Sequence, residues 1–219
     1  VALEIGLKGK KVVAVAPDWP GLERGAKTEE AALARLEAYL PRYAPVAKLA
    51  GMDATLAAST ALEVVDRYPG VGSTDFWGIS FAFSSIDQQV MSSDALEREL
   101  TLMQACWVFF DGVRSRVSAE MQKGARGGGR DRDQIVRHVF HTEMDWAKKL
   151  GLPMGDSANL SAEVVSVHRE SYCTAIRAFH AEGKMAPTWP LRYLIRHTAY
   201  HTMDHAWEME DKDLTEPTA

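Results

Sequence analysis

The 219-residue chain has little cysteine and no long apolar run. Its two cysteines, Cys106 and Cys173, are far apart and neither lies in a CxxC motif. We therefore expect reduced thiols that fill the core rather than a disulfide framework. No segment approaches the roughly 18 consecutive apolar residues that cross a bilayer, and no charged-then-apolar leader opens the chain. A cytoplasmic protein with no membrane partner is expected.

An excess of positive charge is also missing. The chain has 25 Lys and Arg against 30 Asp and Glu, a formal net charge of −5, and no long basic block. Nucleic-acid binding depends on clustered Lys and Arg, so no nucleic-acid partner is expected. With 46% hydrophobic and 25% charged residues, the composition predicts an ordinary globular protein. A small molecule is the expected partner.

The first 90 residues predict a small α+β unit. Lys11–Ala16 is a short apolar run ended by Pro17, which predicts a strand. Thr28 is positioned to cap a helix whose apolar residues keep helical spacing as far as Pro41. Leu62–Tyr68 is the second strand candidate. Two strands around a helix make up this unit, which we expect to form residues 1–90.

Residues 91–219 predict four long helices. Apolar residues recur there every three or four positions, and Asp94 with Glu97 is expected to cap the first helix. The helices are expected from Ser92 to about Lys123, from Asp131 (with Gln134 as its capping partner) to about Leu150, from Ser161 onward, and from Pro190 to about Asp211. Short loops between such helices predict a four-helix bundle. The expected fold class is mainly α, a four-helix bundle preceded by the small α+β unit.

All seven histidines lie after residue 137, and three of them share one face of the last helix. His197, His201 and His205 are spaced i, i+4, i+8, which stacks them one turn apart. His138 and His141 form a second pair on another helix. Imidazoles one turn apart can converge on one metal ion, and a bundle core can supply a third from a facing helix. The alternative is a set of neutral, hydrogen-bonded core histidines.

Polar groups near these histidines have candidate roles. Asp204 and Glu208 lie on the same helix face and are expected to orient the rings. The segment has no Glu directly after His201, so it is not a metalloprotease motif. The glycine-rich loop Arg126–Arg130 is not a P-loop. It is either a solvated connection or a site for an anionic substrate group.

Two segments resemble the DinB/YfiT-like superfamily. Arg196–Glu208, which contains HTMDH, resembles its last helix, and Ile135–Glu143 resembles its second-helix motif. By motif position, the resemblance implies that His138, His201 and His205 hold a divalent metal, Zn²⁺, Ni²⁺ or Fe²⁺, with waters completing the shell. His197 and His141 then line the pocket or support the ligands.

The resemblance also implies a metal-dependent enzyme of the transferase or isomerase class that uses a low-molecular-weight thiol such as mycothiol or bacillithiol. From their proximity on the helix faces, Glu143 and Asp204 are the acid–base candidates and Arg196 is a candidate for holding an anionic group. Alternatives are a metal-dependent hydrolase and a non-catalytic, stress-linked or regulatory binding module. Relatives often pair, so a homodimer is a further expectation. Asp18–Gly21 and Thr28–Ala32 resemble a HicB-type unit, implying an accessory or dimerisation layer.

Overall fold

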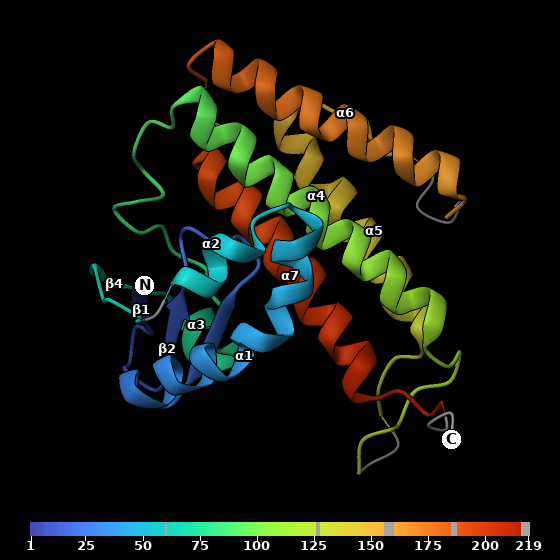
Figure 1. Cartoon of the computed structure of the whole chain (residues 1–219), viewed down its shortest axis with the longest axis horizontal. Coiled ribbons are helices and arrows are strands. Elements are labelled where there is room, and N and C mark those ends of the chain that lie inside the picture. The colour runs from blue at the N-terminus through green and yellow to red at the C-terminus, as the bar shows by residue number, and fades with distance from the viewer. Residues whose placement is uncertain (60, 126–127, 156–159, 185–187, 216–219) are drawn as a thin grey trace.

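The computed structural model describes residues 1–59, 61–125, 128–155, 160–184 and 188–215. It is mainly helical with one small sheet near the N-terminus, as the sequence predicts. Figure 1 shows the sheet and its helices at one side of a set of long helices. The expected loop at Arg126 and Gly127 lies outside the described residues.

The sheet has four strands among the described residues, in the order β3-β2-β1-β4. They are β1 (Ala2–Ile5), β2 (Val12–Val15), β3 (Glu23–Ala26) and β4 (Asp66–Pro69). β1 and β3 each pair with β2 in antiparallel fashion, with Ala2 opposite Val15, whereas β1 and β4 are parallel. The strand expected at Lys11–Ala16 is confirmed as β2. The strand expected at Leu62–Tyr68 is shorter and later, covering only β4.

The sequence prediction missed β1 and β3 because both contain buried charged residues. In β1, the carboxylate of Glu4 accepts hydrogen bonds from Ser80 Oγ at 2.7 Å and from the backbone N–H of Phe81 at 3.1 Å. In β3, Glu23 and Arg24 are 2% and 5% exposed. A strand pattern read from hydrophobicity does not recognise such positions, because their partners are remote in sequence.

Helix α1 (Glu29–Leu49) continues past Pro41, where we expected it to end. Pro41 and Pro45 both lie inside the helix and on its exposed side. Each proline removes a backbone hydrogen bond, but burial of the opposite face offsets that loss. Tyr43, for example, is fully buried and its hydroxyl donates to the carbonyl of Pro20 at 2.7 Å.

Four long helices follow the N-terminal unit. They are α4 (Ser93–Arg116), α5 (Arg132–Ala147, extended by a 3₁₀ turn at Lys148–Leu150), α6 (Ala162–Ala181) and α7 (Leu191–Asp211). Two short helices, α2 (Asp53–Ala58) and α3 (Gly72–Trp77), belong to the first part of the chain. α4 packs along α7, α5 packs against α7, and α6 meets α5. This arrangement places α7 between α4 and α5.

Helix α4 begins where expected, but its capping residue differs from the expectation. Ser92, not the expected pair Asp94 and Glu97, caps the helix, and its hydroxyl accepts from the backbone N–H of Ala95 at 3.2 Å. The end differs too, because the backbone becomes extended at Val117. The helix is therefore shorter than the apolar periodicity suggests.

The start of α5 is as expected. The backbone N–H of Gln134 donates to the carbonyl of Asp131 at 2.9 Å, and the side chain of Gln134 accepts from the backbone N–H of Asp131 at 2.9 Å. Reciprocal bonds of this kind fix the first turn of a helix. They therefore fix where the residues of α5 lie around its axis.

One hydrophobic core runs through the N-terminal unit and the long helices. Leu3 of the sheet and Leu36 of α1 belong to the same buried cluster as Met103 of α4 and Met203 and Trp207 of α7. The core thus crosses the boundary that we expected at residue 90, and it fixes α7 against the rest of the chain.

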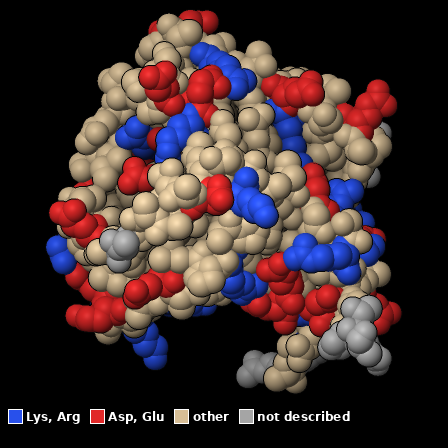
Figure 2. Space-filling model, in the orientation of Figure 1, with Lys and Arg blue, Asp and Glu red and all other residues tan. Residues whose placement is uncertain are grey.

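The face seen in Figure 2 carries acidic and basic side chains that are interspersed. None of the helices within the described residues has the length and apolar character that a membrane-spanning segment requires.

Candidate metal centre

α5 and α7 bring together the three histidines that the resemblance marks as metal ligands. His138 projects from α5, and His201 and His205 project from α7 one turn apart. One ring nitrogen of each lies within 4.8 Å of the others. All three side chains are partly exposed. The i, i+4 spacing places two rings on one face, and the packing of α5 against α7 supplies the third.

The geometry of the three rings suits a shared divalent ion. Nε2 of His138 and Nε2 of His201 are 3.2 Å apart. Two nitrogens at about 2.0–2.1 Å from one Zn²⁺ in a tetrahedral shell are separated by about 3.3 Å. The centroids of the rings of His138 and His205 are 4.9 Å apart, and those of His201 and His205 are 4.6 Å apart. One pair of nitrogens therefore already has the separation that a shared ion requires, and a ring nitrogen of His205 lies within 4.8 Å of both.

The protonation states also favour metal binding. Burial, with a further contribution from His205, lowers the pKa of His138 to about 4. Burial, followed by the neighbouring rings of His205 and His138, holds the pKa of His201 well below its usual value. Both rings are neutral at pH 7, and only a neutral imidazole nitrogen has a lone pair to offer a metal.

Glu208 orients the third ligand. Nδ1 of His205 lies 2.6 Å from Oε2 of Glu208, and Nζ of Lys212 lies 2.5 Å from Oε1 of the same carboxylate. These bonds, that from His205 above all, lower the pKa of Glu208 to about 2. An ionised carboxylate only accepts, so Nδ1 carries the proton and Nε2 is left as the donor to a metal. The hydrogen bond with His205 therefore supports the expected role of Glu208 in orienting that ring.

His197 shares the helix face of the ligands but lies in a different environment. It is 5% exposed and stacks on Tyr193, with ring centroids 5.0 Å apart. Burial, with a further contribution from Arg196, lowers its pKa to about 3. His141 is exposed on α5. Neither belongs to the group of three converging nitrogens.

Asp204, an acid–base candidate, contacts a different group. Its Oδ1 accepts from Nη1 of Arg24 at 3.2 Å, and its side chain is 44% exposed. Arg24 in turn lies over the rings of Tyr39 and Trp207. The structure therefore places Asp204 in a contact between α7 and the N-terminal unit.

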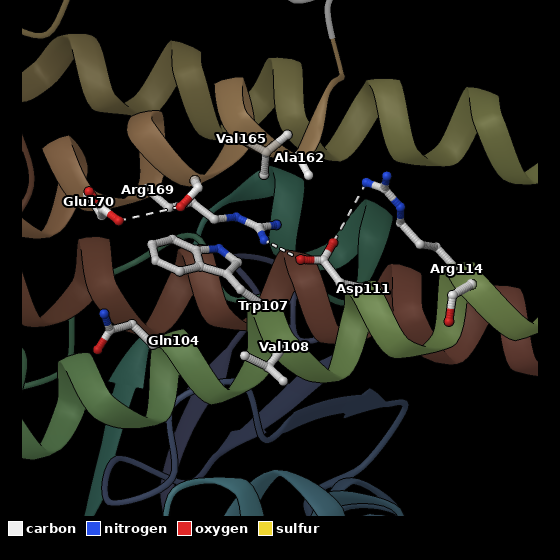
Figure 3. A pocket seen from close by; sticks show the side chains of 11 residues that line it. Gln104, Trp107, Val108, Asp111, Arg114, Ala162, Val165, Arg169 and Glu170 are labelled. Carbon is white, nitrogen blue, oxygen red and sulfur yellow. Dashed lines mark hydrogen bonds and ion pairs between the residues drawn. The ribbon is translucent and has the colours of Figure 1, made fainter.

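Glu143, the second acid–base candidate, contacts residues of α6. Its buried Oε1 lies 3.3 Å from Nε2 of His168 and 3.6 Å from Nε of Arg169. Arg169 also donates to Asp111 of α4 at 2.7 Å. Figure 3 shows Arg169 beside the indole of Trp107, in a cleft of about 520 Å³ between α4 and α6. Glu143 is thus part of an ionic cluster that links three helices.

Arg196, the candidate for holding an anion, is occupied by the chain itself. Its guanidinium donates to both carboxylate oxygens of Asp87, at 2.7 and 2.8 Å, and to Glu23 at 3.1 Å. The remaining bonds go to Ser80 Oγ and to the carbonyl of Ala82. A guanidinium has five N–H groups, and these five bonds use that capacity. The 3% exposure of Arg196 leaves no surface for a substrate.

The described ends of the glycine-rich loop are also paired within the chain. Lys123 forms an ion pair with Asp131, and Arg132 forms one with Asp133. Both cysteines are free and buried, as expected of thiols that fill the core.

Sequence reasoning missed Lys212 as a partner of Glu208. The i, i+4 spacing of the two residues is the signal that identifies such a pair on a helix. Sequence reasoning also missed the contact between the rings of Trp146 and His201, whose centroids are 5.2 Å apart. The two residues lie on different helices, so their spacing in the sequence does not indicate the contact.

Comparison with known proteins gives no match: no protein family, no curated protein and no solved structure is significantly similar to this chain.

Proposed function

We propose that this protein binds one divalent metal ion through His138, His201 and His205 and uses it on a small-molecule substrate. The observation that carries the proposal is the convergence of three imidazole nitrogens within 4.8 Å. Isolated histidines on an apolar face are ordinary core residues. Three that converge, one of them held by a carboxylate, are the donor set of an open metal site.

The chain's own residues have distinct parts in this proposal. The three histidines hold the ion, and Glu208 keeps the proton of His205 on Nδ1. A divalent ion with open positions supplies Lewis-acid chemistry, polarising a carbonyl or thiol or lowering the pKa of a bound water. Zn²⁺, Ni²⁺ and Fe²⁺ all accept imidazole ligands.

We further propose that the protein is a DinB/YfiT-like metalloenzyme built on a four-helix bundle of α4–α7. Two things support it: the order of the ligands along the chain, with one on the second long helix and two on the last, and the packing of α7 between α4 and α5. On this proposal the reaction is a transferase or isomerase step that uses a low-molecular-weight thiol. Because Glu143 and Asp204 lie outside the group of converging ligands, the proposal gives them no catalytic role.

Elemental analysis of tag-free protein tests the metal site. We expect about one divalent metal per chain in the wild type and none in His201→Ala, with the same helical circular-dichroism spectrum. His141→Ala is the matched control, an exposed histidine on α5, and it should keep the metal. Stoichiometric metal in His201→Ala, or none in the wild type after incubation with zinc, nickel and iron, would contradict the proposal.

A further inference from the structure

The burial pattern of α3 is the reverse of what its residue types favour. Of its six described residues, Thr74 alone is buried, and its hydroxyl donates to the buried carboxylate of Glu4. Phe76 and Trp77, its two largest apolar residues, are 70% and 63% exposed. Their rings contact each other edge to face, with centroids 4.6 Å apart. Adjacent exposed aromatic side chains are unfavourable in water, so they indicate a surface that another apolar phase or molecule covers.

The turn between β1 and β2 is fixed beside α3, which itself packs against β2 (Figure 1). The carboxylate of Asp75 accepts from the backbone N–H of Lys8 at 2.6 Å and from that of Lys10 at 2.8 Å. Leu7, in the same turn, is 69% exposed. These bonds hold the turn and the helix together, so their exposed side chains belong to one fixed part of the surface. We name this part the aromatic tip; it consists of Leu7, Lys8, Lys10, Phe76 and Trp77.

The aromatic tip carries an excess of positive charge. Residues 6–11 contain three lysines and no acidic residue, and these lysines outnumber the one carboxylate that contacts the turn. Lys8 and Lys10 are exposed. Nζ of Lys11 donates to the carbonyl of Phe76 at 2.8 Å, which places a third ammonium group next to α3. The whole chain has a net charge of −5, so the excess is local. Cations around exposed apolar groups favour an anionic partner.

The size of the aromatic tip favours a lipid surface over a folded protein. Leu7, Phe76 and Trp77 together expose on the order of 400 Å². Each partner in a stable protein complex buries roughly 800 Å². A bilayer interface needs less, because a few aromatic and aliphatic side chains enter the headgroup region while nearby lysines contact anionic lipids. The apolar area and the charge of the tip are therefore those of a peripheral membrane contact.

We propose that the aromatic tip docks this protein reversibly on an anionic lipid bilayer, with Leu7, Phe76 and Trp77 in the interface and Lys8 and Lys10 on the anionic headgroups. The proposal is independent of the metal site. The expectation of no membrane partner rests on the absence of a long apolar run, which bears on spanning segments and not on a peripheral contact. Binding through a few side chains is weak, so it depends strongly on lipid charge and on salt.

Vesicle sedimentation of the full, tag-free chain tests the proposal. Vesicles of phosphatidylcholine are compared with vesicles in which about 30% of the lipid is phosphatidylserine, at low and at high salt. We expect about tenfold tighter binding to the anionic vesicles at low salt, with most of the difference lost at high salt. A wild type that sediments with neither kind of vesicle, or equally with both, would overturn the proposal.

Removing an apolar side chain of the tip should weaken binding. Phe76→Ser and Trp77→Ser should each lower the affinity for anionic vesicles about tenfold, because each takes a ring out of the interface. Val167→Ser is the matched control, since Val167 is 57% exposed on α6, and it should bind as the wild type does. Equal losses in all three variants would contradict an assignment to the aromatic tip.

Reversing the charge of the tip should remove the preference for anionic lipid. The double variant Lys8→Glu, Lys10→Glu should bind both kinds of vesicle alike. The control Lys48→Glu, Lys184→Glu replaces two exposed lysines elsewhere and changes the net charge by the same amount, from −5 to −9. The control should keep most of the preference. The same loss in both double variants would show that net charge and not the tip governs binding.

Fluorescence quenching locates the contact without depending on the serine variants. Lipids brominated on the acyl chain quench tryptophans that enter a bilayer. Trp77→Phe keeps a ring, so it should bind nearly as tightly as the wild type yet lose most of the quenching. Unchanged quenching in Trp77→Phe would overturn the proposal. So would dimerisation in sedimentation equilibrium that Trp77→Ser abolishes, without vesicle binding, because it would assign the tip to a second copy of the chain.

Discussion

Helix α7 carries two clusters of polar groups that lie on different faces and in different environments. Arg196 is engaged by Asp87, Glu23 and the loop around Ser80, and all of its N–H groups donate within the chain. Five and nine residues further along the helix, His201 and His205 converge with His138. Arg196 is 3% exposed, whereas the three histidines are partly exposed.

The difference shows which polar residues are available for chemistry. A buried charge needs partners from the chain itself, because an unpaired charge in the interior is costly. The partners of Arg196 are permanent, so it stabilises the fold and cannot bind a substrate. The three histidines converge and are partly exposed, and His138 and His201 are neutral at pH 7, so their ring nitrogens can be offered to an external ion. Three predictions separate the two clusters further.

The largest expected effect is on the Arg196 cluster. Arg196→Met should lower the free energy of unfolding by about 3–5 kcal/mol, because it leaves Asp87 and Glu23 buried without their cation. Urea denaturation measures the change. The control Arg116→Met removes a half-exposed guanidinium paired with Glu210 and should cost less than about 1 kcal/mol. Similar losses in both variants would show that the buried cluster has no special role.

The second prediction concerns the carboxylate that supports the metal ligand. Glu208→Gln should weaken zinc binding about 10- to 100-fold, because an amide orients His205 less strongly than an ionised carboxylate. Competition with a zinc-sensitive dye measures the affinity. Glu210→Gln is the control on the same helix, since Glu210 pairs with Arg42 and Arg116. An unchanged zinc affinity in Glu208→Gln would exclude the assigned role.

The smallest effect is on the pH dependence of the metal-free protein. The pKa of His138 is lowered to about 4 in the folded chain, against about 6.5 when unfolded. The unfolded state binds the proton first, so the histidine contribution is fully present above pH 6.5 and is lost as pH falls towards 4. We expect a loss on the order of 1 kcal/mol, allowing for partial exposure.

Comparison with His138→Gln isolates this contribution. Burial raises the pKa of Glu23 to about 8 and that of Glu99 to about 7. These two carboxyl groups have the opposite effect on the free energy of unfolding. Their folded pKa is the higher one, so they take up protons in the folded state first and raise stability as pH falls towards about 4.5. They are present in both proteins, so the difference between the two urea-stability profiles reports His138. Profiles that stay parallel from pH 7 to 4 in EDTA would contradict the prediction.

Helix geometry explains which of the predicted site residues lie together in the structure and which do not. His201, His205 and Glu208 recur at three- and four-residue steps, so they share a face wherever the helix lies. Glu143 is five residues from His138, and Arg196 is five from His201. At about 100° per residue, five residues turn the side chain about 140° away. That Glu143 and Arg196 lie away from the metal ligands therefore follows from the sequence, once the angular position of each residue around the helix axis is calculated.

By itself the sequence determined most of α5, α6 and α7, the cap of α5 and the spacing of His201 and His205, because periodicity and caps act over a few residues. Only the tertiary structure decided that His138 meets that pair. It also decided that β1 and β3 are strands, that Glu23 and Arg196 are buried, and that Trp146 lies beside His201. Each of these depends on a partner far along the chain, and Asp87 is 109 residues from Arg196. Burial of a polar group is favourable only when such a partner is in place.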